Sequence, residues 1–196
     1  WFVNFRFPGW ENTKFDKESG LPEGWKKSEL GLVSQMKYGT MPKKELIQTK
    51  GFPIFSGYRI TGFYHEKMFD SPILVVVARG VGGTGDVKIS PPNCWLTNLS
   101  IAILCDRSKI LQSFLFHFLK NENLRMLDSG AAQSQITINS LSRYPILIPD
   151  MDIQNKYFTV YSKLYEQKMN LHTQNQKLKE ARDILLPRLM NRTINV

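Results

Sequence analysis

The sequence is poor in cysteine and histidine, and it lacks any apolar stretch long enough to cross a membrane. Its longest apolar run, residues 73–78, suits a buried strand, whereas a membrane-spanning helix needs about 20 such residues. The two cysteines, Cys94 and Cys105, lie in apolar or strand-like surroundings, so we expect two free thiols in a cytoplasmic protein. These absences argue against a membrane protein and against a small disulfide-linked scaffold.

The sequence also lacks a complete catalytic or metal-binding motif. His65, His117 and His172 are scattered, no Cys–His or Ser–His–Asp spacing stands out, and the carboxylates form no recognisable pair. A triad that only the fold assembles stays open. We therefore expect no catalytic residue and no bound metal, and a chain of this kind is expected to act by binding.

A glycine-rich segment, residues 80–85, matches the G-x-G-x-x-G pattern of dinucleotide-binding turns. In such a site the turn opens into a helix whose amide groups face the ligand. Here residues 86–90 have the pattern of a strand and a double proline follows, so the segment is predicted to be a hairpin tip. A binding role for the tip stays open, because glycines allow close backbone approach and Arg79 and Lys88 flank it.

Positive charge is in excess, with 26 lysines and arginines against 17 acidic residues and a net charge of +9. The excess is spread over the chain and is not confined to a tail. Such a balance favours a polyanionic partner such as DNA or RNA, although many basic proteins bind neither. Polar loops that combine basic, aromatic and amide side chains make double-stranded DNA the favoured ligand.

The candidate DNA-contacting residues lie in polar loops or beside the glycine-rich segment. Lysine and arginine suit phosphates, and glutamine can read a base edge through two hydrogen bonds. Each residue taken singly also fits an ordinary solvated surface. The candidates are Lys37, Lys43, Lys44, Tyr58, Arg59, Arg79, Lys88, Gln133 and Gln135. We expect Tyr58, Gln133 and Gln135 to approach bases and the charged residues to contact the backbone.

Residues 21–150 show the short, punctuated hydrophobic segments of a strand-rich globular domain. Strands are expected at residues 52–55, 58–63, 73–79, 86–89, 100–104 and 144–148. A helix with a broad apolar face is expected over residues 110–119, capped by Asp106 or Ser108. Residues 1–20 contain several aromatic side chains and are expected to form a connector that docks on another surface.

Residues 152–186 have the pattern of one long polar helix with a narrow apolar stripe. Positions spaced by seven hold Tyr157, Leu164, Leu171, Leu178 and Leu185, and positions four residues later hold Tyr161, Lys168, Asn175, Arg182 and Leu189. A stripe this narrow favours pairing with another helix over packing on the chain's own domain. The residues expected to pair are Tyr157, Tyr161, Leu164, Leu171, Asn175, Leu178 and Leu185. Pro187 is expected to end or kink the helix after Leu186.

Five segments together resemble the specificity subunit of type I restriction-modification systems. They are residues 1–5, residues 21–25, residues 73–85 with Trp95, residues 129–149, and Gln154 with residues 184–190. The resemblance implies the C-terminal half of such a subunit: a connector at 1–20, a target recognition domain at 21–150 and a conserved long helix at 151–196. The expected fold class is α+β, with a mixed strand-rich globular domain followed by one long C-terminal coiled-coil helix. Because the chain starts at Trp1, we expect it to be a piece of a longer chain or a processed one.

The resemblance further implies a non-catalytic subunit of a bacterial or archaeal complex. In the family, two recognition domains each read half of a split DNA target, and antiparallel helices hold them apart. S-adenosylmethionine belongs to partner modification subunits that methylate adenine N6, and restriction subunits add cleavage. We therefore expect no cofactor in this chain, no membrane contact and, for a half-subunit, a homodimer through the long helix. Two alternatives stay open: the recognition domain of a single-chain adenine-N6 methyltransferase, and a coiled-coil adaptor without DNA binding.

Overall fold

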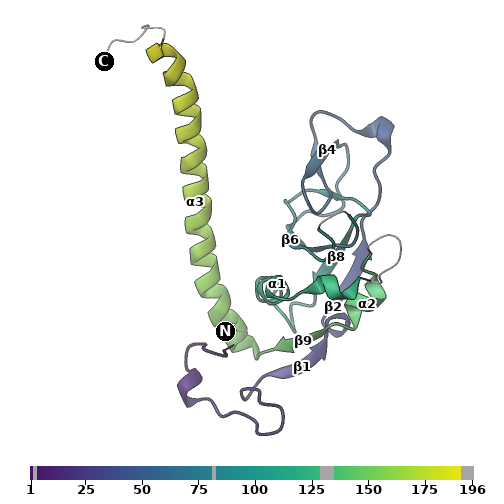
Figure 1. The fold of residues 1–196 in the computed structure, drawn as a ribbon, viewed down its shortest axis with the longest axis vertical. Helices are drawn as coiled ribbons and strands as arrows, with labels where there is room; N and C mark the ends of the chain where they lie inside the picture. The colour runs from purple at the N-terminus through teal and green to yellow at the C-terminus, as the bar shows by residue number, and fades with distance from the viewer. Residues whose placement is uncertain (2–3, 81–82, 129–134, 191–196) are drawn as a thin grey trace. The chain divides into compact units, whose positions relative to one another are not determined.

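The chain forms two structural units, Trp1–Asn155 and Lys156–Val196, in a computed structural model that describes residues 1, 4–80, 83–128 and 135–190. The first unit combines three β-sheets with short helices, and the second consists of most of one long helix (Figure 1). This arrangement confirms the α+β fold class. Among the described helices, none combines the length and the hydropathy that crossing a membrane requires.

A four-stranded antiparallel sheet lies in the middle of the first unit. Its order is β2 (Ser34–Tyr38), β8 (Ser100–Cys105), β5 (Leu74–Val77) and β6 (Val87–Ile89). All four side chains of β5 are fully buried, which explains why this strand is an unbroken apolar run rather than an alternating one. Strands β5 and β6 form an antiparallel pair on either side of the glycine-rich segment, as the sequence predicts.

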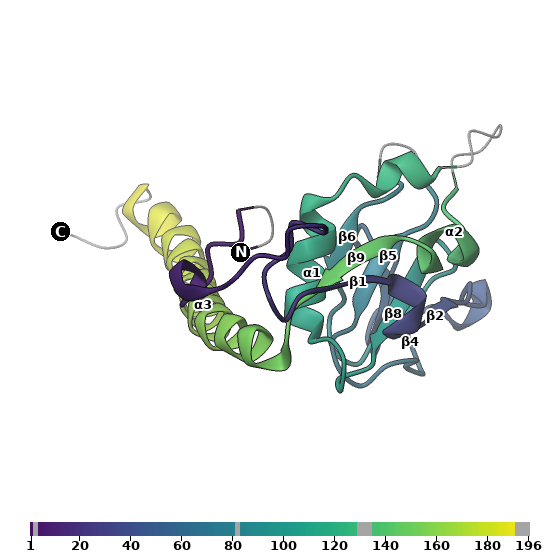
Figure 2. The same ribbon diagram turned by 90° about the horizontal axis from the view of Figure 1, so that it is seen from below.

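Two smaller sheets complete the unit. One has the order β4 (Ile60–Tyr64), β3 (Phe52–Phe55) and β7 (Trp95–Leu96), with β3 and β7 parallel. The other pairs β1 (Lys26–Glu29) with β9 (Pro145–Ile148) in antiparallel fashion. Figure 2 shows these two strands side by side next to α1. The pair joins the beginning of the first unit to its end, just before the long helix begins.

Short helices cover the edges of the sheets. Helix α1 spans Gln112–Asn121 and buries Phe114, Leu115, Phe118 and Leu119. Helix α2 (Ile138–Ser142) begins with a capping box in which the Thr137 hydroxyl accepts a hydrogen bond from the Ser140 amide at 3.1 Å. The described residues also contain 3-10 helices: η1 (Trp10–Asn12), η2 (Leu30–Leu32), η3 (Lys44–Leu46) and η4 (Leu124–Leu127).

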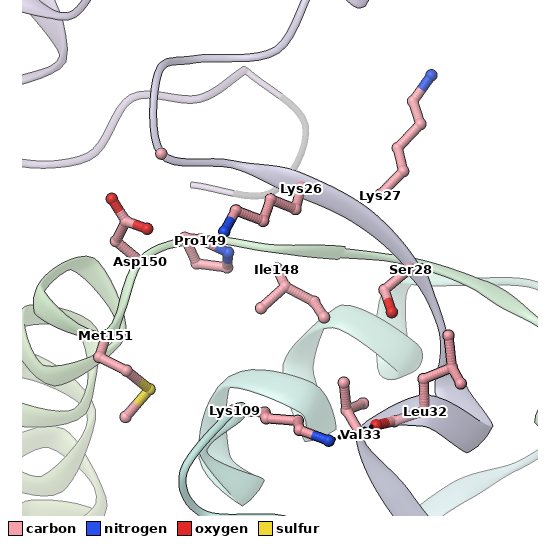
Figure 3. A pocket seen from close by; sticks show the side chains of 11 residues that line it. Lys26, Lys27, Ser28, Leu32, Val33, Lys109, Ile148, Pro149, Asp150 and Met151 are labelled. Carbon is pink, nitrogen blue, oxygen red and sulfur yellow. Dashed lines mark hydrogen bonds between the residues drawn. The ribbon is translucent and has the colours of Figure 1, made fainter.

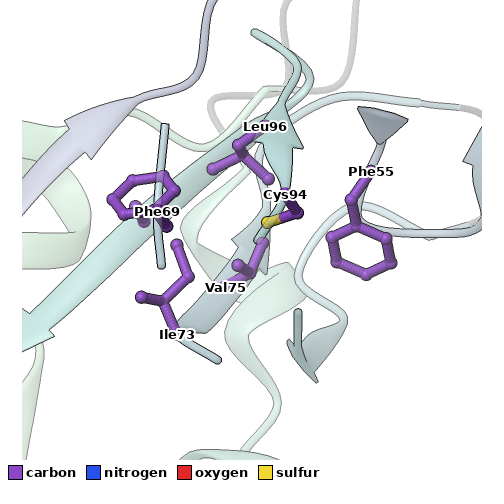
Figure 4. Close-up of a cluster of buried hydrophobic side chains, with 7 residues drawn as sticks. Phe55, Phe69, Ile73, Val75, Cys94 and Leu96 are labelled. Carbon is purple, nitrogen blue, oxygen red and sulfur yellow. The ribbon is translucent and has the colours of Figure 1, made fainter. Parts of the chain in front are cut away.

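One hydrophobic cluster joins strands of the four-stranded sheet to strands of the three-stranded sheet (Figure 4). Its members are Phe55, Phe69, Ile73, Val75, Cys94, Leu96 and Ala102. Full burial of a Val, Leu or Phe side chain contributes about 1.5–3 kcal/mol, so the cluster fixes the relative positions of the two sheets. Cys94 and Cys105 are both free thiols, as expected; Cys94 is buried and Cys105 is half-buried.

Two of the aromatic residues near the start of the chain, Phe5 and Phe7, pack on the chain's own globular unit, and docking of this segment on another surface stays a prediction. Phe7 is buried, and the ring centroids of Phe5 and Trp25 are 5.1 Å apart. Trp25 in turn contacts Phe114 of α1 edge-on, at a centroid distance of 6.1 Å. The physical reason is that Trp25 and α1 leave an apolar surface that the first residues cover.

The expected cap of α1 was wrong. Asp106 makes a local turn instead: its carboxylate accepts from the Ser108 amide at 3.0 Å, and its carbonyl accepts from the Lys109 and Ile110 amides. Helix α1 starts after Leu111, which makes no side-chain cap. The Leu111 amide donates to the side chain of Gln154, so a distant residue replaces the local cap.

The last helix of the chain, α3, spans Met151–Met190 and has 40 residues, or about 60 Å. It begins where predicted, with Asp152 in its first turn. Pro187 was expected to end or kink the helix; it does not end it, because the helix continues through Pro187 for three more residues. Proline removes one helical hydrogen bond but does not stop a helix when the flanking turns retain theirs.

Candidate nucleic-acid interface

Tyr58 lies in the turn between β3 and β4, and the local sequence explains its position. The Ser56 amide donates to the Arg59 carbonyl at 3.1 Å and the Ser56 hydroxyl donates to the same oxygen at 3.0 Å. Gly57 has a positive φ of 85°, a conformation that favours glycine. The expected strand at 58–63 therefore begins only at Ile60, and Tyr58 is presented on a tight turn.

The Tyr58 ring packs against the glycine-rich segment. Its hydroxyl donates to the Arg79 carbonyl at 3.1 Å, and a Cβ atom added to Gly80 or Gly83 would overlap the ring. Gly80 and Gly83 thus allow the backbone to approach the aromatic ring closely. Burial, with a smaller contribution from the Asp86 carboxylate, raises the pKa of Tyr58, so its hydroxyl stays protonated at neutral pH.

Arg79 brings a second predicted residue to the same place. Arg79 and Gln135 form an antiparallel β-bridge, and the neighbouring Ile136 amide donates to the Ala78 carbonyl at 2.9 Å. The Gln135 backbone amide donates to the Asp128 carboxylate at 2.9 Å. We call Tyr58, Arg79 and Gln135 the tyrosine–arginine cluster. Backbone contacts thus bring together three residues whose side chains are a phenol, a guanidinium group and an amide, which are groups suited to bases and phosphates.

Two further predicted cations lie beside this cluster along the chain. Arg59 directly follows Tyr58 in the turn and is exposed. Lys88 on β6 forms an ion pair with Asp86 at 3.2 Å, and Asp86 is the same carboxylate that acts on Tyr58. Asp86 balances Lys88, so Arg59 and Arg79 supply the positive charge at the cluster, opposed by the Asp128 carboxylate that accepts from the Gln135 backbone amide.

The remaining predicted residues are not part of this cluster. Lys37 on β2 lies over the ring of Phe69, with its ammonium 4.6 Å from the ring centroid. Lys43 and Lys44 are exposed at the start of η3. Gln133 lies outside the described residues. DNA contact by all of these residues, and by the cluster itself, stays a prediction.

A cavity of about 400 Å³ lies elsewhere in the first unit, beside the β1–β9 sheet (Figure 3). In Figure 3, Ile148 points into it, whereas Lys27 points away. Lys109 lies at its lower side and donates to the Leu32 carbonyl at 3.1 Å. None of the predicted DNA-contacting residues lines this cavity. Pattern reasoning did not single out Lys26 and Lys27, which are among its lining residues.

Gln154 is fully buried in the first turns of α3. Its side-chain oxygen accepts from the Leu111 amide at 2.8 Å, and its side-chain nitrogen donates to the carbonyls of Lys109 and Pro149 at 3.0 and 2.9 Å. Both side-chain donor hydrogens and the side-chain oxygen are used, and they hold two backbone segments, residues 109–111 and Pro149. The residue therefore fixes the start of α3 to the segment that leads into α1.

Helix α3 carries the narrow apolar stripe that the sequence predicts. Tyr157, Tyr161 and Tyr165 stack along one side, with successive ring centroids 6.4 and 5.7 Å apart. Burial, followed by the neighbouring Tyr161, raises the pKa of Tyr157 to about 12. Beyond the tyrosines, Leu171 and Leu178 are 59% and 67% exposed. Within the described residues, no group of three or more His, Cys, Asp or Glu side chains is placed to hold a metal ion.

Comparison with known proteins places these features in a family context. A family model described as "Type I restriction modification DNA specificity domain" matches residues 22–180. A relative from Methanocaldococcus jannaschii, named type I restriction enzyme MjaIX specificity subunit, is 24% identical over 217 residues, covering 97% of this chain and 49% of the relative. The match spans the strand-rich domain and most of α3.

Solved structures show a similar fold. The S subunit of a type I restriction-modification system from M. genitalium has a TM-score of 0.75 and 21% identity, over 90% of this chain and 47% of that one. The HsdS subunit from Thermoanaerobacter tengcongensis has a TM-score of 0.59 and 18% identity, over 91% of this chain and 47% of that one. The chain thus spans about half the length of the relatives that it matches.

Proposed function

Because this chain belongs to the family of type I restriction modification DNA specificity domains, we propose that it reads one half of a bipartite DNA target and directs a modification subunit to it. The family match over residues 22–180 is the observation that carries this proposal. The tyrosine–arginine cluster supports it physically, since it gathers base-reading and phosphate-binding groups on a chain with a net charge of +9.

The second half of the target is read by a second copy of this chain. Within the described residues 156–190, α3 makes up its whole unit and carries an exposed strip of leucines. Two copies that pair through α3 restore a two-domain arrangement with two-fold symmetry. Antiparallel pairing, as the family resemblance implies, places one recognition domain at each end of the helix pair.

The chain itself is not an enzyme in this proposal. The methyl donor, S-adenosylmethionine, is bound by the partner modification subunit, which transfers the methyl group to adenine N6. Restriction subunits join the same complex to cleave unmodified DNA. The role of this chain is to supply sequence information through base and phosphate contacts and to hold the modification subunits at the target.

Methylation mapping tests the proposal. The chain would be produced together with its modification subunit in a host that lacks adenine methylation, and N6-methyladenine would be mapped across the genome. We expect methylation at one split motif whose two halves are the same sequence on opposite strands, because one chain reads both halves. A matched culture with the modification subunit alone serves as the control. Methylation that does not depend on this chain would contradict the proposal.

A further inference from the structure

The segment of residues 41–50, which we call the η3 loop, is held by the three-stranded sheet near both of its ends. Just before its start, the Thr40 carbonyl accepts a hydrogen bond from the Trp95 indole of β7 at 2.8 Å. Near its end, Gln48 forms an antiparallel bridge with Phe63 of β4, with backbone hydrogen bonds of 2.9 and 3.3 Å. The backbone of the loop is therefore fixed on β4 and β7.

The side chains of the η3 loop, in contrast, are exposed. Pro42 is its one buried residue. Met41 is 59% exposed and Leu46 is 38% exposed, although both are apolar. Ile47 is exposed as well, but it packs on the sheet, because a Cβ atom added to Gly62 would lie 3.0 Å from the Ile47 Cγ2 atom. The fold thus orders the backbone of the loop and leaves its apolar side chains open to a partner.

Positive charge lies between and beside these apolar side chains. The loop holds Lys43, Lys44 and Lys50 against one carboxylate, that of Glu45. Within the part of the chain that the structure describes, none of the three lysines forms an ion pair, whereas three other lysines of the first unit each pair with an aspartate. An anionic partner therefore fits the loop better than a neutral one.

The position of the loop favours DNA over an acidic protein as this partner. Tyr58 of the tyrosine–arginine cluster lies five residues before Phe63, which pairs with the loop. A chain advances at most about 3.6 Å per residue, so Tyr58 and Phe63 lie within about 18 Å of each other, or about five base pairs of DNA. One duplex therefore reaches both surfaces within one half of a split target.

We propose that the η3 loop enters the major groove, where Met41 and Leu46 contact thymine methyl groups and the lysines contact phosphates. The inference rests on the proposed function and adds to it a second reading surface and a base preference. The thymine methyl group is the apolar group on the base edges of the major groove, whereas the minor groove presents hydrogen-bonding groups. Side chains without a hydrogen-bond donor select thymine by contact. The half-target is therefore expected to contain at least one A·T pair besides that of the methylated adenine.

Deoxyuridine substitution tests the contacts with thymine, because deoxyuridine pairs as thymidine does but lacks the methyl group. A duplex that carries the mapped target would be prepared with one thymine replaced at a time, and binding of the full chain would be measured by fluorescence anisotropy. At one or more positions the affinity of the parent chain is expected to fall roughly fourfold, as for the loss of one buried methyl group. Met41→Ala or Leu46→Ala should bind the original and the substituted duplex equally at the position that its side chain contacts.

Leu32→Ala is the matched control, because Leu32 is an apolar residue of η2 that is 64% exposed and lies outside the η3 loop. It should respond to deoxyuridine as the parent chain does, and circular dichroism checks that each variant is folded. A parent chain that tolerates deoxyuridine at every thymine, or a response that survives in both Met41→Ala and Leu46→Ala, overturns the inference and leaves the proposed function intact. A mapped half-target without a further A·T pair overturns it as well.

The lysines are tested on a short duplex of arbitrary sequence, which requires no mapped target. In Lys43→Gln/Lys44→Gln the slope of log affinity against log salt concentration is expected to decrease in magnitude by about two, because two phosphate contacts are lost. Lys26→Gln/Lys27→Gln, on β1 at the other end of the first unit, removes the same charge and should keep the parent slope (Figure 1). An unchanged slope in the first variant overturns DNA as the partner of the loop, and so does a loss of binding to the modification subunit with DNA binding intact. A parent chain that binds no DNA at low salt contradicts both this inference and the proposed function.

Discussion

Arg79 is the residue on which the proposed DNA contact can be tested most directly. It belongs to the tyrosine–arginine cluster. Its Nε atom is buried and has no hydrogen-bond partner among the described residues. Arg79→Ala is expected to weaken binding of a duplex that carries the mapped target by about 1.5–3 kcal/mol, roughly 10- to 150-fold, because it removes a charged hydrogen bond to the DNA backbone. Fluorescence anisotropy would measure this at several salt concentrations. Lys120→Ala, at the exposed end of α1, is the control, and equal losses in both variants would remove Arg79 from the interface.

Cys105 gives the first unit a stability that depends on pH. Burial, opposed in part by Arg107, raises the pKa of the Cys105 thiol to about 11 from an ordinary value of 9.0. The folded chain therefore keeps the proton that the unfolded chain releases above pH 9, and stability is lost as pH rises from 9 toward 11. The loss is about 2 kcal/mol. Urea unfolding should show a decline that is about 2 kcal/mol larger in the parent chain than in Cys105→Ala, in which the tyrosines with raised pKa values still titrate, and identical profiles would contradict the assignment.

Among the elements, those with a strong hydrophobic pattern could be predicted and those without one could not. Strand β5 is an unbroken apolar run, α1 repeats apolar residues every three to four positions, and α3 follows a heptad. Strand β1 reads Lys-Lys-Ser-Glu and pairs only because β9 lies beside it in the fold. Its conformation is set by a distant partner, so no local pattern reveals it.

Gln154 holds the first turn of α3 within the first unit. Gln154 makes three hydrogen bonds to backbone groups near the start of α1 and α3. Gln154→Ala leaves these buried groups without partners and is expected to lower the free energy of unfolding of the first unit by about 2–4 kcal/mol. Denaturant unfolding followed by tryptophan fluorescence would measure the loss. Gln167→Ala, on the exposed part of the same helix, should change stability by less than about 0.5 kcal/mol.

At the scale of the whole molecule, the candidate site shows where sequence reasoning stops. Tyr58, Arg79 and Gln135 could be selected from the sequence by residue type and loop position. Their grouping could not, because it depends on the hydroxyl contact of Tyr58 with the Arg79 backbone and on the Arg79–Gln135 bridge. Lys37 was selected by the same reasoning, yet its ammonium lies over Phe69. Residue chemistry identifies candidates, and long-range pairing decides which of them meet.

The length of α3 sets the distance between the two halves of the target in the proposed dimer. Insertion of seven residues after Gln174 keeps the seven-residue repeat of α3 in phase and lengthens each helix by about 10 Å. DNA rises about 3.4 Å per base pair, so the gap of the methylated motif should grow by about three base pairs while both half-sequences stay the same. Methylation mapping with the modification subunit measures the gap. A four-residue insertion is the control, because it shifts the seven-residue repeat out of phase and should weaken both helix pairing and methylation. An unchanged gap in a heptad variant that still dimerises would show that the helix pair does not determine the spacing.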